Sequence, residues 1–112
     1  MFKLRKSTKE KQLSELDKLE KYLKDHGYNY ERVDGYRGSM KIIRHQVVVY
    51  KDGRKDWDAV CQHGSCGFEQ GLLEIMGSIV DKETDGSIIV GFLTANDVID
   101  RIEQKENINE RL

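Results

Sequence analysis

The chain has 112 residues, 38% of them hydrophobic and 35% charged, with a formal net charge of −1 at pH 7. Its length accommodates a single domain, residues 1–112, with a small core, and its near-zero charge excludes a nucleic-acid footprint over the whole protein. The sequence contains neither an apolar run of membrane-spanning length nor the pattern of a signal peptide. We therefore expect a soluble cytoplasmic protein that does not contact a membrane and keeps both cysteines reduced.

Residues 8–26 are predicted to form a long amphipathic helix. Ser7 and Glu10 have the spacing of a capping box, and Gly27 is well placed to end the helix. Leucines recur at every third or fourth position and form one narrow apolar stripe on an otherwise charged helix. The stripe either packs on the chain's own core, which we favour because most amphipathic helices do so, or forms the seam of a homodimer.

Three strands are predicted next, in segments rich in aromatic and β-branched residues: 28–33, 40–50 and 55–62. Residues 34–39 contain turn-forming dipeptides and mark a loop between the first two strands. Asp52 and Gly53 predict a tight hairpin between the second and third strands, because glycine accepts the positive φ that such turns need.

The second half of the chain begins with a glycine-rich turn at residues 64–67. A central helix is predicted over residues 68–80, where apolar residues recur at helical spacing. A polar loop and a short strand over residues 87–92 follow. Thr94 and Asp97 then have the spacing of a helix cap and predict the start of a C-terminal helix.

These elements predict an α+β fold, in which a small antiparallel sheet of three or four strands packs with an N-terminal, a central and a C-terminal helix. A basic N-terminal arm, residues 1–7, precedes the folded part. The polar tail, residues 104–112, is expected to fray.

The candidate functional residues gather between Trp57 and Met76, a segment that holds the only Trp, both Cys and one of the three His. In the predicted strand, Trp57 and Cys61 share one face and Asp58 lies on the other. We expect a site for a partner or ligand on this strand and the turn after it, formed by Trp57, Asp58, His63, Ser65 and Glu69.

Zinc binding is one alternative for the same segment. Cys61, His63 and Cys66 offer three ligands of the types that Zn²⁺ takes, and His26 or His45 could supply a fourth. The second block of ligands that usual zinc motifs contain is missing. We therefore favour a protein without a cofactor, with Cys61 buried in its strand.

Catalysis is a second alternative. Cys66 would lie near the start of the predicted central helix, where the positive helix end lowers a thiol pKa, but a nucleophile also needs a base within hydrogen-bond reach. A metal-dependent hydrolase or nuclease could instead use Asp58, His63 and Glu69. The free amides of the 64–67 turn could hold an anion such as a nucleotide phosphate.

Nucleic-acid binding is a third alternative, and it depends on the basic start of the chain. The cations that could contact phosphates there are Lys3, Arg5, Lys6 and Lys9. Aromatic residues that would stack on bases are absent from this segment. A solvated helix start explains the same charges equally well.

Several strings spread over most of the chain point to one group of proteins. They are His26-Gly27-Tyr28, Trp57-Asp58-Ala59-Val60-Cys61, Gly64-Ser65, Gly67, Gly71-Leu72-Leu73-Glu74, Gly91-Phe92-Leu93-Thr94-Ala95 and Asp97-Val98-Ile99. On these strings the chain resembles small proteins encoded by phages and prophages of Gram-positive bacteria, in which an aromatic residue is usual at the position of Cys66. The group has no assigned reaction, so the resemblance implies a context only: host takeover or the blocking of host defence.

The leading hypothesis is a small non-enzymatic accessory protein of the phage type. It would bind a host protein or a small nucleotide-like ligand, and its sharper form is an inhibitor of a bacterial antiviral defence. The alternatives are the metal-dependent hydrolase or nuclease and a nucleic-acid-binding accessory protein that uses the basic N-terminal helix.

Overall fold

The computed structural model describes residues 8–37 and 42–111. In chain order its elements are α1 (Thr8–Asp25), β1 (Tyr30–Arg37), β2 (Ile42–Lys51), β3 (Arg54–Val60), the 3₁₀ turn η1 (Phe68–Gln70), β4 (Leu73–Gly77), α2 (Lys82–Asp85), β5 (Ile89–Leu93) and α3 (Ala95–Arg111). The predicted α+β class is confirmed, with five strands in place of three or four. None of the helices in the described part of the chain combines the length and the apolarity that a membrane span requires.

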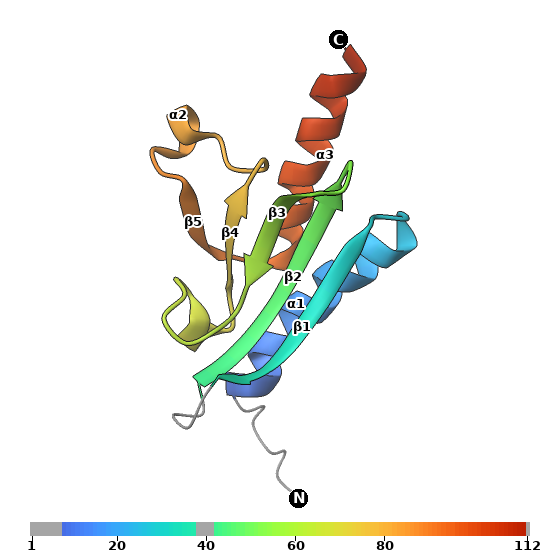
Figure 1. The fold of residues 1–112 in the computed structure, drawn as a ribbon. Coiled ribbons are helices and arrows are strands. Elements are labelled where there is room, and N and C mark those ends of the chain that lie inside the picture. The colour runs from blue at the N-terminus through green and yellow to red at the C-terminus, as the bar shows by residue number, and fades with distance from the viewer. Residues whose placement is uncertain (1–7, 38–41, 112) are drawn as a thin grey trace, which may run out of the picture.

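The five strands form one antiparallel sheet in which each strand pairs with its neighbour in the sequence (Figure 1). The tight hairpin between β2 and β3 is confirmed, since Asp52 and Gly53 have φ values of 54° and 77°. Because the strand order follows the sequence order, β1 and β5 are the two edges of the sheet.

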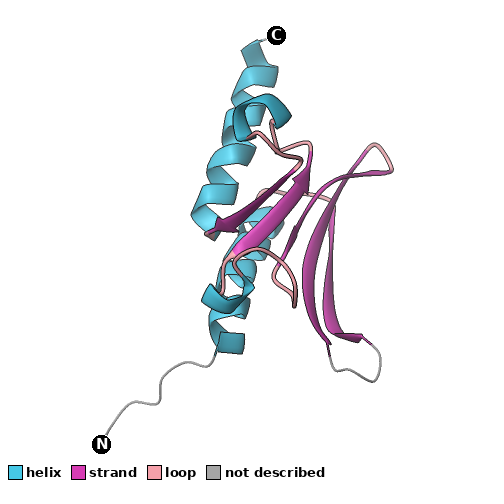
Figure 2. Ribbon diagram, turned by 90° about the vertical axis from the view of Figure 1, so that its left-hand side faces the viewer, coloured by secondary structure: helices cyan, strands magenta, loops and turns pink. Residues whose placement is uncertain are grey.

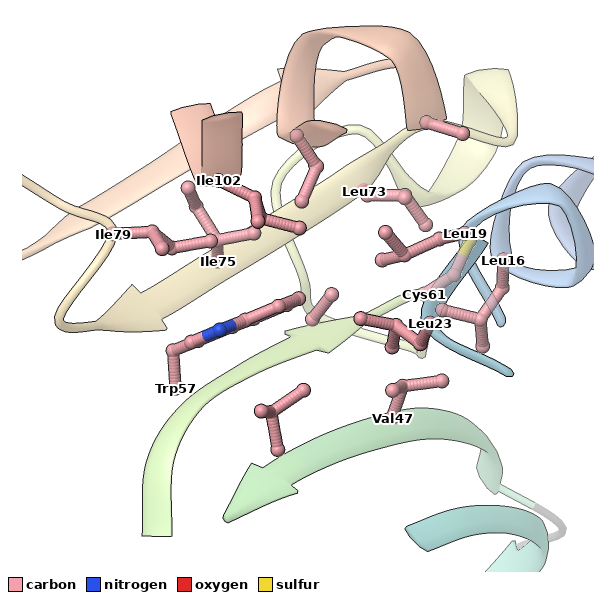
Figure 3. Close-up of a cluster of buried hydrophobic side chains, with 14 residues drawn as sticks. Leu16, Leu19, Leu23, Val47, Trp57, Cys61, Leu73, Ile75, Ile79 and Ile102 are labelled. Carbon is pink, nitrogen blue, oxygen red and sulfur yellow. The ribbon is translucent and has the colours of Figure 1, made fainter. Parts of the chain in front are cut away.

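Both long helices lie on the same side of the sheet (Figure 2), and the core fills the space between the two layers (Figure 3). The apolar stripe of α1 serves this core, because Leu16, Leu19 and Leu23 have no exposed surface. These residues are therefore not available as the seam of a homodimer. Trp57 and Cys61 share the core face of β3, as their alternation predicts.

The long helices end and begin where the sequence predicts. Gly27 has a φ of 74° just beyond the end of α1. At the start of α3, the Thr94 Oγ1 atom accepts a hydrogen bond from the Asp97 amide (3.1 Å), and the Asp97 carboxylate accepts one from the Thr94 amide (2.9 Å). This reciprocal cap satisfies two amides that a helix start leaves without a partner.

The predicted central helix over residues 68–80 is wrong. Its first residues form the short turn η1, and β4 follows, with Leu73 and Ile75 buried and Met76 exposed on the alternate face. Pairing of β4 with β3 and β5 satisfies the backbone, and the strand buries Leu73 and Ile75 on its core face. Gly77, with a φ of 108°, ends the strand beside Trp57, and a Cβ there would lie 2.6 Å from the Trp57 Cα atom.

Three smaller expectations also differ from the structure. Asp34 and Gly35 belong to β1 and not to a loop, because Asp34 pairs across the strands with His45. The predicted polar loop before β5 contains α2, and helical backbone continues through the expected tail to Arg111.

The proposed nucleic-acid residues fall at the start of the chain. Lys3, Arg5 and Lys6 lie outside the described residues. Lys9 belongs to the first turn of α1.

Candidate functional site

The connection between β3 and β4, residues 61–72, folds into a compact turn held by its own polar groups. The Ser65 Oγ atom accepts a hydrogen bond from the Gln62 amide (3.0 Å) and donates one to the Gln62 carbonyl (2.7 Å). The Cys66 amide donates to the Glu74 carboxylate (2.5 Å), and the Leu72 amide donates to the Gly67 carbonyl (2.9 Å). These bonds give the turn one defined shape.

The turn also packs against edge strand β5. The Phe92 amide donates to the Cys66 carbonyl (3.1 Å). Gly91 passes so close to Cys66 that a Cβ at this position would overlap the cysteine side chain, and a Cβ on Gly67 would lie 3.1 Å from the Phe92 Cα atom. Both glycines are therefore required for this close approach of two backbones.

Phe92 has the most unusual conformation at this contact. Its φ of 59° lies in the left-handed region, which residues with a Cβ rarely adopt. Its side chain is nevertheless 60% exposed, so burial of the ring does not compensate for the backbone strain. The hydrogen bond to Cys66 and the packing of Gly91 hold the residue in this state.

The turn and Phe92 together surround a hollow of about 490 Å³, lined by residues 63–70 and Phe92. Inside it the His63 imidazole meets the Phe68 ring edge to face, with 4.7 Å between the ring centroids. His63, Cys66 and Glu69 are exposed, so the hollow is open to solvent. It offers aromatic faces and backbone polar groups with one carboxylate at its rim.

Three of the five predicted site residues meet at this hollow: His63, Ser65 and Glu69. Trp57 does not, because its indole is only 2% exposed and belongs to the core (Figure 3). Asp58 is also buried, where it accepts a hydrogen bond from Gln46 Nε2 (2.8 Å) and faces Lys55 Nζ at 3.4 Å. The alternative catalytic set of Asp58, His63 and Glu69 is thus not brought together in the hollow.

The three predicted zinc ligands point to different environments. Cys61 is completely buried in the core, and this burial raises the pKa of its thiol to about 11. His63 and Cys66 are exposed on the turn. Among residues 8–37 and 42–111, no group of three or more His, Cys, Asp or Glu is arranged to hold a metal ion.

The helix expected after Cys66 is not formed, because the chain continues as the three-residue turn η1.

Sequence reasoning missed an apolar surface next to the hollow. Four of the five exposed large hydrophobic residues in the described part of the chain lie on β4, on β5 or just before β5; we call this set the apolar edge: Met76, Ile88, Ile89 and Phe92. Met76 and Ile89 are direct cross-strand partners. The uncharged run from residue 86 to residue 96 is the only signal for this surface in the sequence.

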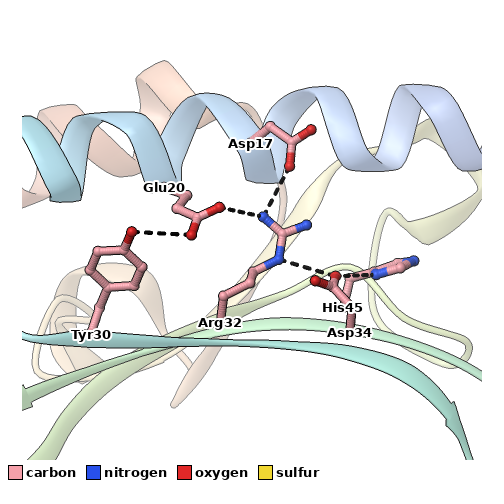
Figure 4. A network of polar contacts seen from close by, with 6 residues as sticks. All are labelled: Asp17, Glu20, Tyr30, Arg32, Asp34 and His45. Atoms are coloured by element: carbon pink, nitrogen blue, oxygen red, sulfur yellow. Dashed lines mark hydrogen bonds and ion pairs between the residues drawn. The ribbon is translucent and has the colours of Figure 1, made fainter.

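A polar cluster occupies the opposite edge of the sheet, between β1 and α1 (Figure 4). The Arg32 guanidinium contacts the carboxylates of Asp17 (3.0 Å), Glu20 (3.1 Å) and Asp34 (3.1 Å). The buried His45 ring lies 2.7 Å from Asp34 through its Nδ1 atom.

Partial burial acts to raise the pKa of Asp34, but the hydrogen bond to His45 and the charge of Arg32 outweigh it and lower this pKa. The contacts of this cluster fasten β1 to α1.

No protein-family model, curated protein or solved structure matches this chain. The resemblance to phage-encoded proteins stays a prediction.

Proposed function

We propose that the protein is a non-enzymatic binding protein that holds a partner protein at the hollow of residues 63–70 and Phe92. The observation that carries this proposal is Phe92, an exposed aromatic residue kept in a strained backbone conformation by the turn that forms the hollow. Strain of this kind is concentrated at sites where a side chain must be presented to a ligand. Aromatic side chains also supply much of the binding energy of protein interfaces.

The shape of the hollow supports a protein partner over a small ligand. Sites for small molecules enclose most of the ligand surface, whereas much of the lining of this hollow is exposed. Its lining residues include neither Lys nor Arg, and Glu69 would repel a nucleotide phosphate. A partner protein that inserts an apolar side chain beside Phe68 and Phe92 fits the same chemistry.

The polar groups around the hollow support a role without catalysis. The Ser65 hydroxyl closes the turn, and the Glu74 carboxylate binds the Cys66 amide. Both groups are thereby engaged in holding the shape of the site. Cys61, whose pKa is raised to about 11 by burial, is not in a state suited to a nucleophile.

The resemblance described above extends the proposal to the identity of the partner. For a phage-type accessory protein, the partner is a host protein, and the sharper form of the proposal is an inhibitor of a bacterial antiviral defence. This extension depends on the resemblance and not on the hollow.

Site-specific photo-crosslinking in cells of a Gram-positive host tests the proposal. In one variant the photo-reactive amino acid benzoylphenylalanine replaces Phe92. In the control variant it replaces Glu31, which lies on the opposite edge of the sheet. We expect a discrete adduct with one host protein from position 92 only, and its loss when unlabelled wild-type protein is co-expressed in excess. Identical adducts from both positions, or no host adduct from position 92, would overturn the proposal.

A further inference from the structure

We infer that β5 pairs with β5 of a second copy of the chain, so that two copies form a two-fold dimer across the apolar edge. The inference rests on the proposed function, because the second copy adds residues to the same hollow. It names the dimer as the form of the protein that presents the binding site.

The chemistry of β5 sets it apart from the remainder of the molecule. Residues 86–96 contain no charged residue, although 35% of the chain is charged. Ile88 is 58% exposed, Met76 40% and Ile89 36%. Natural sheets protect their edges with charged residues, prolines or covering elements, because an unpaired strand invites another strand. In Figure 1, β5 forms the outer border of the sheet, beyond β4.

The occupant that fits this edge is the edge itself. In antiparallel pairing about a two-fold axis at Val90, Phe92 lies opposite Ile88 of the second copy. With the axis between Val90 and Gly91, Phe92 lies opposite Ile89. In either register Phe92 of one copy lies at the level of an exposed isoleucine of the other, and the two-fold axis repeats this arrangement.

The charge of the chain also suits a second copy. Self-pairing of residues 86–96 sets no like charges opposite one another. The net charge of −1 per chain imposes little long-range repulsion between two copies. A small domain gains apolar burial from such an interface, since a chain of this length buries a limited core by itself.

The dimer would change the hollow as well as the edge. Phe92 belongs both to the lining of the hollow and to the apolar edge. An isoleucine of the second copy packed on Phe92 would wall the open side of the hollow and immobilise its ring. The two hollows would then flank one interface, and binding of the partner protein would depend on dimer formation.

Sedimentation velocity and native mass spectrometry of the full chain test the inference. Ile89→Lys places a charge in the centre of the edge, and Ile108→Lys is the matched control, because Ile108 is an exposed isoleucine on α3. We expect dimers for the wild type and for Ile108→Lys, and monomers for Ile89→Lys that keep the circular dichroism spectrum of the fold and melt at a lower temperature, because the stabilisation by association is lost. Should Ile89→Lys fail to fold, Ile88→Lys, which lies outside β5, takes its place and is also expected to be monomeric.

A wild type that stays monomeric at every concentration tested overturns the dimer, and so does an Ile89→Lys variant that dimerises like the wild type. Crosslinking from position 92 distinguishes failure of the inferred dimer from failure of the proposed function. A monomer that still forms a host adduct leaves the proposed function intact. A dimer that forms adducts only between its own two copies supports the inferred dimer. It contradicts the proposal that position 92 binds a partner protein.

Discussion

The two edges of the sheet end the same structure in opposite ways. Edge strand β1 carries Glu31, Arg32 and Asp34, and the last two belong to the ion-pair cluster that fastens the strand to α1. Edge strand β5 carries no charge and exposes Ile89 and Phe92. Charged edges resist pairing with a further strand. The difference teaches that the charges and ion pairs of β1 protect this edge, whereas β5 is open to association.

A substitution in the strand between the edges should have the largest effect. Trp57 of β3 is buried in the core that both edges share, so Trp57→Ala should lower the free energy of unfolding by about 3–5 kcal/mol. Urea unfolding followed by circular dichroism measures this change. A variant with wild-type stability and impaired partner binding would show instead that Trp57 is a contact residue of the predicted site.

A substitution at the charged edge should have an intermediate effect. Arg32→Met keeps much of the apolar stem but leaves the carboxylates of Glu20 and Asp34 without their cation. We expect a loss of about 1–3 kcal/mol of stability, in line with charged hydrogen bonds in partly buried sites. Arg44→Met on β2, outside the cluster, is the control for the same urea experiment. Equal effects of both substitutions would contradict the view that the cluster closes β1.

Acid should weaken both ends of the sheet. Two hydrogen bonds from Arg101 lower the pKa of Asp85 from 3.8 to about 2, and this ion pair joins α2 to α3 close to β5. Because the pKa is lower in the folded state, the pair stabilises the fold above pH 3.8, and this contribution is lost as the pH falls toward 2.

Asp85→Asn should therefore show a shallower loss of stability than the wild type over this pH range, measured by urea unfolding at each pH. Asp100→Asn, at an exposed position on α3, is the control. The pKa of Asp34 is lowered in the same direction, so Asp34→Asn should flatten the same slope at the opposite edge. An unchanged slope in Asp85→Asn would mean that its ion pair adds nothing in solution.

The smallest effect on stability is expected at the apolar edge itself. Phe92→Gly removes the left-handed strain but adds flexibility to the unfolded chain, so in the monomer, at concentrations too low for association, the two effects should nearly cancel and change the free energy of unfolding by less than about 1 kcal/mol. Host-protein binding, measured by co-purification, should nevertheless be lost. If Phe92→Gly destabilised the protein as much as Trp57→Ala, Phe92 would belong to the core. The contrast between the charged edge at β1 and the exposed apolar edge at β5 would then be wrong.

Local patterns in the sequence determined the elements whose signals are complete within a few residues. The leucine stripe and Gly27 predicted α1, the Asp52-Gly53 turn predicted the hairpin, and Thr94 with Asp97 predicted the start of α3. In each case the hydrogen bonds or the burial pattern arise from neighbours in the chain, so the residues alone carry the information.

The candidate site was predicted only in part for the same reason. His63, Ser65 and Glu69 follow one another in a turn that the glycines indicate, and the structure brings them to one hollow. Phe92 joins them from β5 through a backbone contact with Cys66, and nothing in the spacing of these two residues predicts that contact.

The tertiary structure alone decided the secondary structure of residues 68–80 and the exposure of β5. The apolar spacing of Leu73 and Ile75 is compatible with a helix or a short strand, and pairing with β3 selected the strand. Because β4 belongs to the sheet, β5 is the last strand, and its uncharged segment is an exposed edge. Exposure of an edge depends on which strands pair, and pairing is a property of the whole chain.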